Sequence, residues 1–146
     1  MLVDLWQPPG PKPEDRENVE LAVSFAATVV SDACRRGGSN LFVSTTAPGG
    51  DGLHGPASAL LMHDVMEHLA VAEGADADRL PELLQRAAAA VEPGTETVLV
   101  TTRTIDPGDA RFPAQIADSR RRPGAPPIRV VNTSDPGLKD YFQMEE

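Results

Sequence analysis

Polar side chains follow four apolar runs of this chain, and their types are those that could do chemistry. Asp4 and Trp6 end the first run, and residues 44–46 (Ser-Thr-Thr) end the second. Residues 101–103 (Thr-Thr-Arg) and 132–135 (Asn-Thr-Ser-Asp) end two later ones. The carboxyl ends of parallel strands meet at one edge of a sheet, where α/β folds place ligands. We therefore expect these residues to gather on one rim.

From the residues alone, this rim is either a partner-binding surface or only the set of polar residues at the ends of ordinary strands. A partner-binding surface would use the carboxylates, hydroxyls, arginine and tryptophan at the strand ends, namely Asp4, Trp6, Gln7, Thr45, Thr102, Arg103 and Asp135. Trp6, the single tryptophan, is either a half-buried aromatic that covers the end of the sheet or an anchor for a partner. The threonines also agree with ordinary strand propensity.

The segment His63–His68 has the composition of a metal site but not the spacing. The zinc-protease motif needs two histidines at i and i+4 with a glutamate next to the first. Here the i, i+4 pairs are His63 with Glu67 and Asp64 with His68. These are typical pairs on the solvent face of a helix, so we predict no metal ligands here.

Nucleophilic catalysis and nucleotide binding find no support in the sequence. No Gly-x-Ser-x-Gly elbow occurs, and the single Cys34 lies in a helical apolar pattern that predicts burial. Pro8 and Pro9 follow the first strand and remove backbone donors that a phosphate loop would need. We expect Arg120–Arg122 to be a solvated loop. The prediction is no catalytic residue, no metal and no cofactor.

The bulk composition fits one domain. The chain has 146 residues, 40% of them hydrophobic, with a formal net charge of −9. Nucleic-acid binding needs a basic face, so the charge argues against that partner. No apolar stretch is long enough for a membrane span, and the start is not a signal peptide, so we expect a soluble, cytoplasmic chain without membrane contact. Because it begins inside a predicted strand, we interpret it as a fragment.

Hydrophobic periodicity places the rim residues on regular elements. A helix over Pro13–Arg36 is the clearest, with acidic residues in its first turn, basic residues in its last and glycines after it. The other predicted helices are Gly55–Glu73, one from Asp76 or Asp78 to Val91, Pro113–Arg122 and Gly137–Glu146; the predicted strands are Leu2–Trp6, Asn40–Thr46, Leu53–His54, Thr97–Val100 and Ile128–Val131.

The alternation of strands with helices predicts the fold class. Such an order is typical of a mainly parallel sheet with helices on both faces, joined by right-handed crossovers. We predict a three-layer, Rossmann-like α/β domain over residues 1–146, with Leu53–His54 as a short return strand at the sheet edge.

Three segments together resemble a known family. Asp4–Pro8 (Asp-Leu-Trp-Gln-Pro), the first helix from Pro13 to Thr28, and residues 97–103 are similar to the carboxy-terminal part of bacterial domain-of-unknown-function 58 proteins. The resemblance covers essentially the whole chain. It implies a von Willebrand factor A-like fold, normally preceded by membrane-anchored and β-rich parts, whose partner is a MoxR-type AAA+ ATPase. Such complexes act in protein maturation or metal-insertion chaperoning.

The family's metal-ion-dependent adhesion site is incomplete in this sequence. Its pattern is Asp-x-Ser-x-Ser after the first strand, a threonine on a later loop and an aspartate after the fourth strand. Asp4 matches, but Trp6 and Pro8 replace the two serines, and residues 101–103 replace Thr-Asp-Gly. Magnesium requires a shell of hard oxygen ligands. We therefore predict no bound Mg²⁺, and Asp4 either pairs with Arg103 or accepts backbone N–H groups.

Three functions follow as hypotheses. The first is a non-enzymatic A-like interaction domain that docks a protein through the rim around Asp4, Trp6 and Arg103. The second is a small α/β hydrolase or ligand-binding domain that uses Asp4, Thr102 and Asp135. Carboxylates perturbed by burial at that rim would favour it. The third is a scaffold for a function in an absent upstream half.

Overall fold

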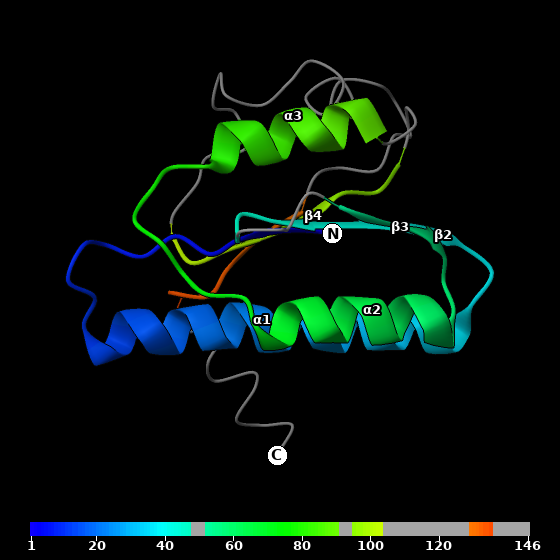
Figure 1. Ribbon diagram of the computed structural model, residues 1–146, viewed down its shortest axis with the longest axis horizontal. Coiled ribbons are helices and arrows are strands. Elements are labelled where there is room, and N and C mark those ends of the chain that lie inside the picture. Colours follow the sequence, from blue (N-terminus) through cyan, green and yellow to red (C-terminus); the bar gives the residue numbers. More distant parts are fainter. Residues whose placement is uncertain (48–51, 91–94, 104–128, 136–146) are drawn as a thin grey trace.

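The computed structural model describes residues 1–47, 52–90, 95–103 and 129–135 (Figure 1). Strands and helices alternate through these residues, so the predicted α/β class is confirmed. In chain order the elements are β1 (Leu2–Asp4), α1 (Pro13–Arg36), β2 (Asn40–Thr45), β3 (Leu53–Pro56), α2 (Ala59–Ala70), α3 (Leu80–Ala90), β4 (Val98–Thr101) and β5 (Arg129–Asn132).

The described strands form one mixed, mostly parallel sheet. Its order is β3-β2-β1-β4-β5, with β1 parallel to both β2 and β4, and β4 parallel to β5. At one edge β3 pairs antiparallel with β2, and Leu53 lies opposite Val43. The predicted antiparallel edge strand near Leu53 is confirmed.

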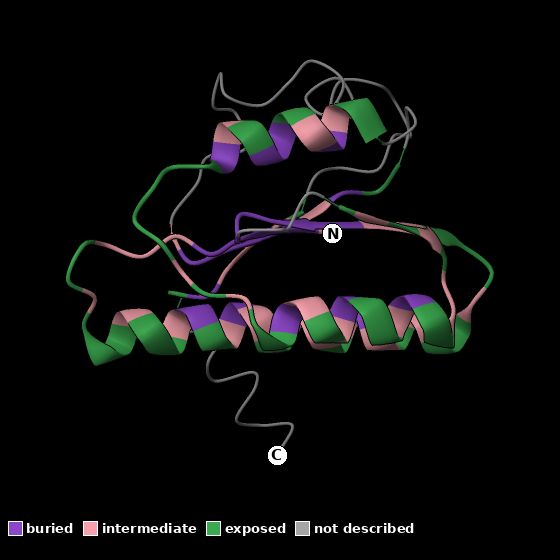
Figure 2. Ribbon diagram, viewed as in Figure 1, coloured by how far each residue is buried: buried purple, intermediate pink, exposed green. Residues whose placement is uncertain are grey.

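Helices cover both faces of the sheet. Figure 1 shows α1 and α2 side by side on one face and α3 on the other. Successive strand residues point to opposite faces, so β1 sends Val3 toward α1 and α2 and Leu2 toward α3. The central strands β1 and β4 are accordingly mostly buried, and each helix buries one side (Figure 2). This arrangement leaves the two ends of the sheet as the surfaces where strand-terminal residues reach solvent.

The first helix forms as its sequence predicts. Its first residue is Pro13, and the Asp15 carboxylate accepts a hydrogen bond of 2.8 Å from the backbone N–H of Lys12. Gly37 ends the helix at φ 64°, a conformation that favours glycine. Cys34 lies on the helix and packs against the core but is only partly buried, so its predicted burial is confirmed in part.

The second helix is shorter than its sequence predicts at both ends. Gly55 and Pro56 belong to β3, and α2 begins after Ser58, whose hydroxyl accepts from the Leu61 N–H at 3.3 Å. Pro56 is tolerated there because it ends an edge strand, where a missing backbone donor costs little. At the other end, residues beyond Ala70 leave the helix because Ala75 pairs with the backbone of residues 5–7.

The remaining boundaries differ from expectation by one or two residues. β1 ends at Asp4, and Trp6 takes part only in an isolated bridge with Ala75. The Asp78 carboxylate accepts from the Leu80 N–H at 3.3 Å, which confirms one of the two capping residues predicted for α3. The predicted helices over 113–122 and 137–146 and the Arg120–Arg122 patch lie outside the described residues. No helix in the described ranges is long and apolar enough to span a bilayer.

Candidate functional site

The order of the strands singles out one position on the sheet. From β1 the chain passes to β2 on one side, whereas β4 lies on the other side, so the direction of strand addition reverses between β1 and β4. In open α/β sheets, ligand sites form outside the carboxyl ends of the strands at such a reversal. The last residues of the two strands, Asp4 and Thr101, are register partners there.

Asp4 is a buried carboxylate held by two donors. Its exposure is 1%. Its Oδ2 atom accepts hydrogen bonds from the Thr101 hydroxyl at 2.9 Å and from the Arg103 Nε at 2.9 Å. Its Oδ1 atom is buried without a hydrogen-bond partner in the part of the chain that the structure describes. Of the two alternatives predicted for Asp4, pairing with Arg103 is the one that the structure shows.

Arg103 joins this buried charge to the surface. Its side chain is 19% exposed and makes a second ion pair, from Nη2 to Asp78 Oδ1, at 2.7 Å. Its guanidinium carbon lies 5.3 Å from the centre of the Trp6 ring, within the range of a cation–π contact. Burial alone lowers the pKa of Arg103, but hydrogen bonds and charge attraction with Asp78 and Asp4 raise that pKa above its ordinary value.

The loop after β1 is fixed against the connection between α2 and α3. The Trp6 indole N–H donates to the Asp76 carbonyl at 3.0 Å, and the Gln7 amide donates to the Gly74 carbonyl at 3.1 Å. The Thr102 hydroxyl donates to the Trp6 carbonyl. A Cβ on Gly74 would lie 2.8 Å from the Val19 side chain and 2.9 Å from the Gln7 amide, so a larger residue here would have to displace these side chains. We call Asp4, Trp6, Gln7, Asp78, Thr102 and Arg103 the carboxyl rim.

Thr45, a predicted site residue, makes a separate polar contact. Its hydroxyl lies 2.9 Å from His68 Nε2 and accepts from the Ala47 N–H at 3.2 Å. The prediction that His68 forms a solvent-face pair was therefore wrong. His68 follows Val65 by three residues on the inner side of α2, and this spacing turns its ring toward the sheet. The predicted pair of His63 with Glu67 does form at the surface, at 3.1 Å.

Asp135 lies in the turn after β5. Its backbone N–H donates to the Asn132 carbonyl at 3.1 Å, and the residue is exposed. Its neighbour Thr133 is buried and donates to the Asn18 carbonyl at 3.1 Å, which ties this turn to α1. Contacts thus connect five of the seven predicted site residues, while Thr45 and Asp135 take part in other contacts.

Sequence reasoning missed the acidic partner of Arg103. Asp78 was considered only as a helix cap, and the structure shows it in both roles. Gly74 and the Asp76 carbonyl were also missed. A backbone carbonyl leaves no mark in the sequence, so only the glycine at position 74 could have pointed to this connection.

The chemistry of the rim suits recognition better than catalysis. The position beside Asp4 where a cation would bind holds the Arg103 guanidinium. Within the described ranges, no group of three or more His, Cys, Asp or Glu side chains is arranged to hold a metal ion. What the rim offers a ligand is a fixed indole, a charged guanidinium and a half-exposed carboxylate. Tryptophan and arginine are the side chains that most often dominate protein interfaces.

Comparisons with known proteins identified no relative. No protein-family model matches the chain, and no curated protein or solved structure matches it either. The function proposed below therefore depends on the geometry of the site and on the resemblance described from the sequence.

Proposed function

We propose that this chain is a non-enzymatic interaction domain that docks a protein partner through the carboxyl rim. The observation that carries the proposal is Arg103, which is held between Asp4 and Asp78 and lies against Trp6. A side chain fixed in this way loses little conformational freedom when a partner binds, and a preorganised surface gains affinity for that reason.

The same contacts bear on a metal-dependent mode of docking. Arg103 supplies the positive charge that a divalent ion would otherwise bring to Asp4, and Trp6 and Pro8 offer no hydroxyl ligands. Magnesium binds through carboxylates, other hard oxygens and retained water. We propose that the chain corresponds to an A-like domain with a degenerate metal-ion-dependent adhesion site, in which an internal ion pair replaces the metal.

The sheet supports a Rossmann-like, von Willebrand factor A-like assignment. A mostly parallel sheet with a short antiparallel strand, β3, at its edge is the arrangement expected from the resemblance. On this basis the proposed partner is a MoxR-type AAA+ ATPase, bound in the cytoplasm.

The alternative of a hydrolase or ligand-binding domain has less support from the contacts. It needs Asp4 to act as a base or ligand, yet Oδ2 of Asp4 is occupied by Thr101 and Arg103. Its other carboxylate, Asp135, is an exposed residue of the turn after β5. A cavity lined by described residues lies at the opposite end of the sheet, around the starts of the strands.

Binding to a purified MoxR-type ATPase tests the proposal. The variants are Trp6→Ala, which removes the exposed part of the rim's aromatic surface, and Asp78→Ala, which removes the outer carboxylate. Glu96→Ala is the matched control because Glu96 forms an exposed ion pair with Arg129 at the other end of the sheet. Circular dichroism confirms that each variant is folded.

The expected result is weaker capture by both rim variants and unchanged capture by Glu96→Ala. Equal capture by wild type and all three variants would remove the rim from the account. Trp6→Ala is expected to have the larger effect because a central aromatic contributes more to binding than a charge at the margin.

A further inference from the structure

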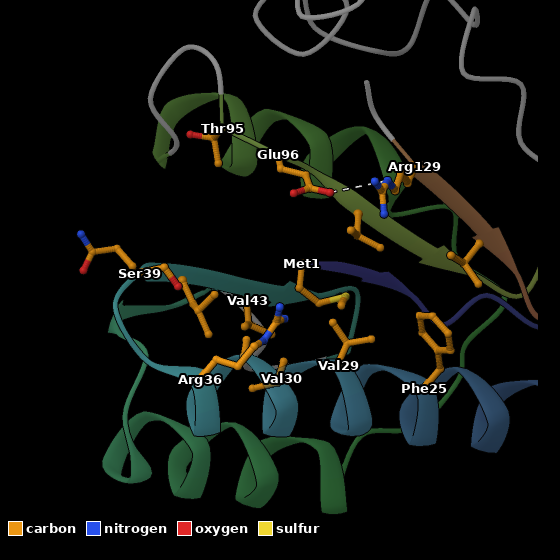
Figure 3. Close-up of a pocket in the computed structure, with 15 residues that line it drawn as sticks. Met1, Phe25, Val29, Val30, Arg36, Ser39, Val43, Thr95, Glu96 and Arg129 are labelled. Atoms are coloured by element: carbon orange, nitrogen blue, oxygen red, sulfur yellow. Dashed lines mark ion pairs between the residues drawn. The ribbon is translucent and has the colours of Figure 1, made fainter. Parts of the chain in front are cut away.

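A cavity of about 500 Å³ lies at the amino end of the sheet, between α1 and the strands (Figure 3). Figure 3 shows side chains of α1 facing side chains of the strands across it. Its wall is mainly apolar and includes Phe25, Val29 and Val30 of α1, Leu41 of β2, Val98 of β4 and Val131 of β5. Small-molecule sites are mostly apolar concavities of about 300–1,000 Å³ with a few polar groups that orient the ligand. This cavity has the size and the lining of such a site.

The apolar side chains of this wall are only partly covered by the rest of the chain. Val29, Val98 and Val131 border the cavity and are half-buried. By contrast, Val3 and Val100, on the same face of the central strands, are 0% exposed. Contact with a ligand that removes apolar surface from water is favourable. The wall therefore favours a ligand with a hydrocarbon body, and since an apolar cavity of about 150 Å³ holds one benzene ring, this one has room for roughly 20 carbon atoms.

The charged residues at the mouth of the cavity favour an anionic head group. Arg36 at the end of α1 and Arg129 at the start of β5 line it, and Glu96 is the only carboxylate among the described residues that do so. The lining is thus net positive in a chain whose formal net charge is −9. Arg36 pairs with Asp32 and Arg129 pairs with Glu96, but all four side chains are more than half exposed. Exposed pairs of this kind are weak, so both guanidinium groups can bind another carboxylate at little cost.

We propose that the cavity binds a monocarboxylate with a long hydrocarbon chain. The chain of the ligand lies against the apolar wall, and its carboxylate accepts hydrogen bonds from Arg36 and Arg129 at the mouth. Hydrogen bonds from guanidinium to carboxylate are stronger than those between neutral groups. The head group stays near solvent, so no charge is buried without a partner. The carboxyl rim lies at the other end of the sheet, so this site does not depend on the proposed docking function.

Titration calorimetry of the full chain with three ligands of equal chain length separates the wall from the mouth. Decanoate, decanol and decylammonium are used as monomers, below the concentrations at which they aggregate. All three have the same apolar body, but only decanoate gains the contacts with the two arginines. Decanoate should therefore bind about tenfold more tightly than decanol. Decylammonium should bind most weakly because its charge faces two guanidinium groups. No saturable binding of decanoate, or no preference for it over the other two, overturns the proposal.

Methyl signals in the spectrum of the isotope-labelled chain place the ligand. Val29 and Val131 report from the cavity, and Leu83 and Leu84 report from the α3 face of the sheet. Decanoate is expected to shift the signals of Val29 and Val131 and to leave those of Leu83 and Leu84 unchanged. Unchanged signals of Val29 and Val131 at saturating decanoate overturn the proposal, because the ligand then binds elsewhere.

Variants of the mouth test how the head group is recognised. The double variant Arg36→Ala, Arg129→Ala removes both guanidinium groups and should weaken decanoate binding about tenfold while decanol binding stays the same. Arg35→Ala is the matched control because Arg35 is the exposed neighbour of Arg36 on α1 and does not line the cavity. Circular dichroism confirms that each variant is folded. An equal loss for both ligands in the double variant, or an equal loss of decanoate binding in Arg35→Ala, overturns the proposal.

Discussion

The two ends of the sheet each carry an ion pair, and the two pairs differ in how far they are buried. At the carboxyl end, Asp4 is 1% exposed, and Arg103 pairs with it across 2.9 Å at 19% side-chain exposure. At the amino end, Arg129 and Glu96 are 3.5 Å apart with side chains 68% and 53% exposed, beside an apolar cavity. The first pair is mostly buried, whereas the second is exposed to solvent at the edge of the cavity.

This difference has an energetic consequence. Water screens an exposed ion pair, and its two long side chains lose entropy, so such a pair contributes little. A buried pair need not stabilise a protein more than apolar residues would, but removal of one partner leaves the other charge desolvated and uncompensated. The carboxyl end should therefore be sensitive to single substitutions, and the amino end should tolerate them.

The largest expected effect is at Arg103. Arg103→Ala leaves the Asp4 carboxylate buried with the Thr101 hydroxyl as its remaining side-chain donor, and the expected loss of unfolding free energy is about 3–5 kcal/mol. Arg129→Ala, the matched change at the exposed pair, should cost about 0–1 kcal/mol. Urea unfolding at neutral pH measures both. Equal losses in the two variants would contradict the distinction between the two ends.

Gly74→Ala should have the next largest effect. A Cβ at this position would meet Val19 at 2.8 Å and Gln7 at 2.9 Å, whereas a Cβ at Gly55 would meet nothing within 4 Å. Overpacking of this kind costs about 1–3 kcal/mol. Gly55→Ala in β3 is the control and should be close to neutral. Thermal unfolding compares the two, and a neutral Gly74→Ala would show that the loop after β1 is not held tightly against residues 74–76.

Thr45→Val should have a smaller effect. It removes a hydroxyl that contacts His68 and accepts from the Ala47 N–H, and loss of such a hydrogen bond costs about 1 kcal/mol. His63→Ala, which breaks only an exposed pair on the same helix, is the control and should change stability less. Urea unfolding measures the free energy of unfolding of both variants. A larger loss of that free energy in His63→Ala than in Thr45→Val would show that the contact of His68 with the sheet contributes nothing to stability.

The smallest expected effect is that of alkaline pH on the contribution of Arg103. Its pKa is raised in the folded state, so its stabilising charge is fully present below the unfolded pKa and is lost only as pH rises through the folded one. That window begins above about pH 12. The difference in unfolding free energy between wild type and Arg103→Ala should therefore stay constant from neutral pH to about pH 10. A steep decline over that range would contradict the assignment.

The sequence predicted the fold better than it predicted the contacts. The apolar stripe of α1, its acidic first turn and its terminal glycine are local signals, and the helix forms where they indicate. The prediction of an edge strand at Leu53 was also correct. The end of α2 was wrong because a tertiary contact, the pairing of Ala75 with residues 5–7, competes with the helical pattern of the sequence.

In the candidate site too, the sequence predicted the positions at strand ends but not the contacts between elements distant in sequence. Strand ends predicted that Asp4 and Arg103 would lie on one rim, because topology alone brings them there. Packing between elements distant in sequence brings Asp78 and His68 to their partners. From the sequence, Asp78 was predicted to be only a helix cap, and His68 was predicted to face solvent. The side chains found from sequence are those that strand direction positions, and those missed depend on where the helix connections cross the sheet.

Titration calorimetry with Mg²⁺ and Mn²⁺ tests the central claim, that an internal ion pair at the carboxyl end takes the place of a bound metal. Because Arg103 holds Asp4 Oδ2 and no serine hydroxyls stand nearby in the loop after β1, wild type should show only the heat of dilution. A saturable binding curve that disappears in Asp4→Ala would contradict the claim and would restore a metal site to this rim.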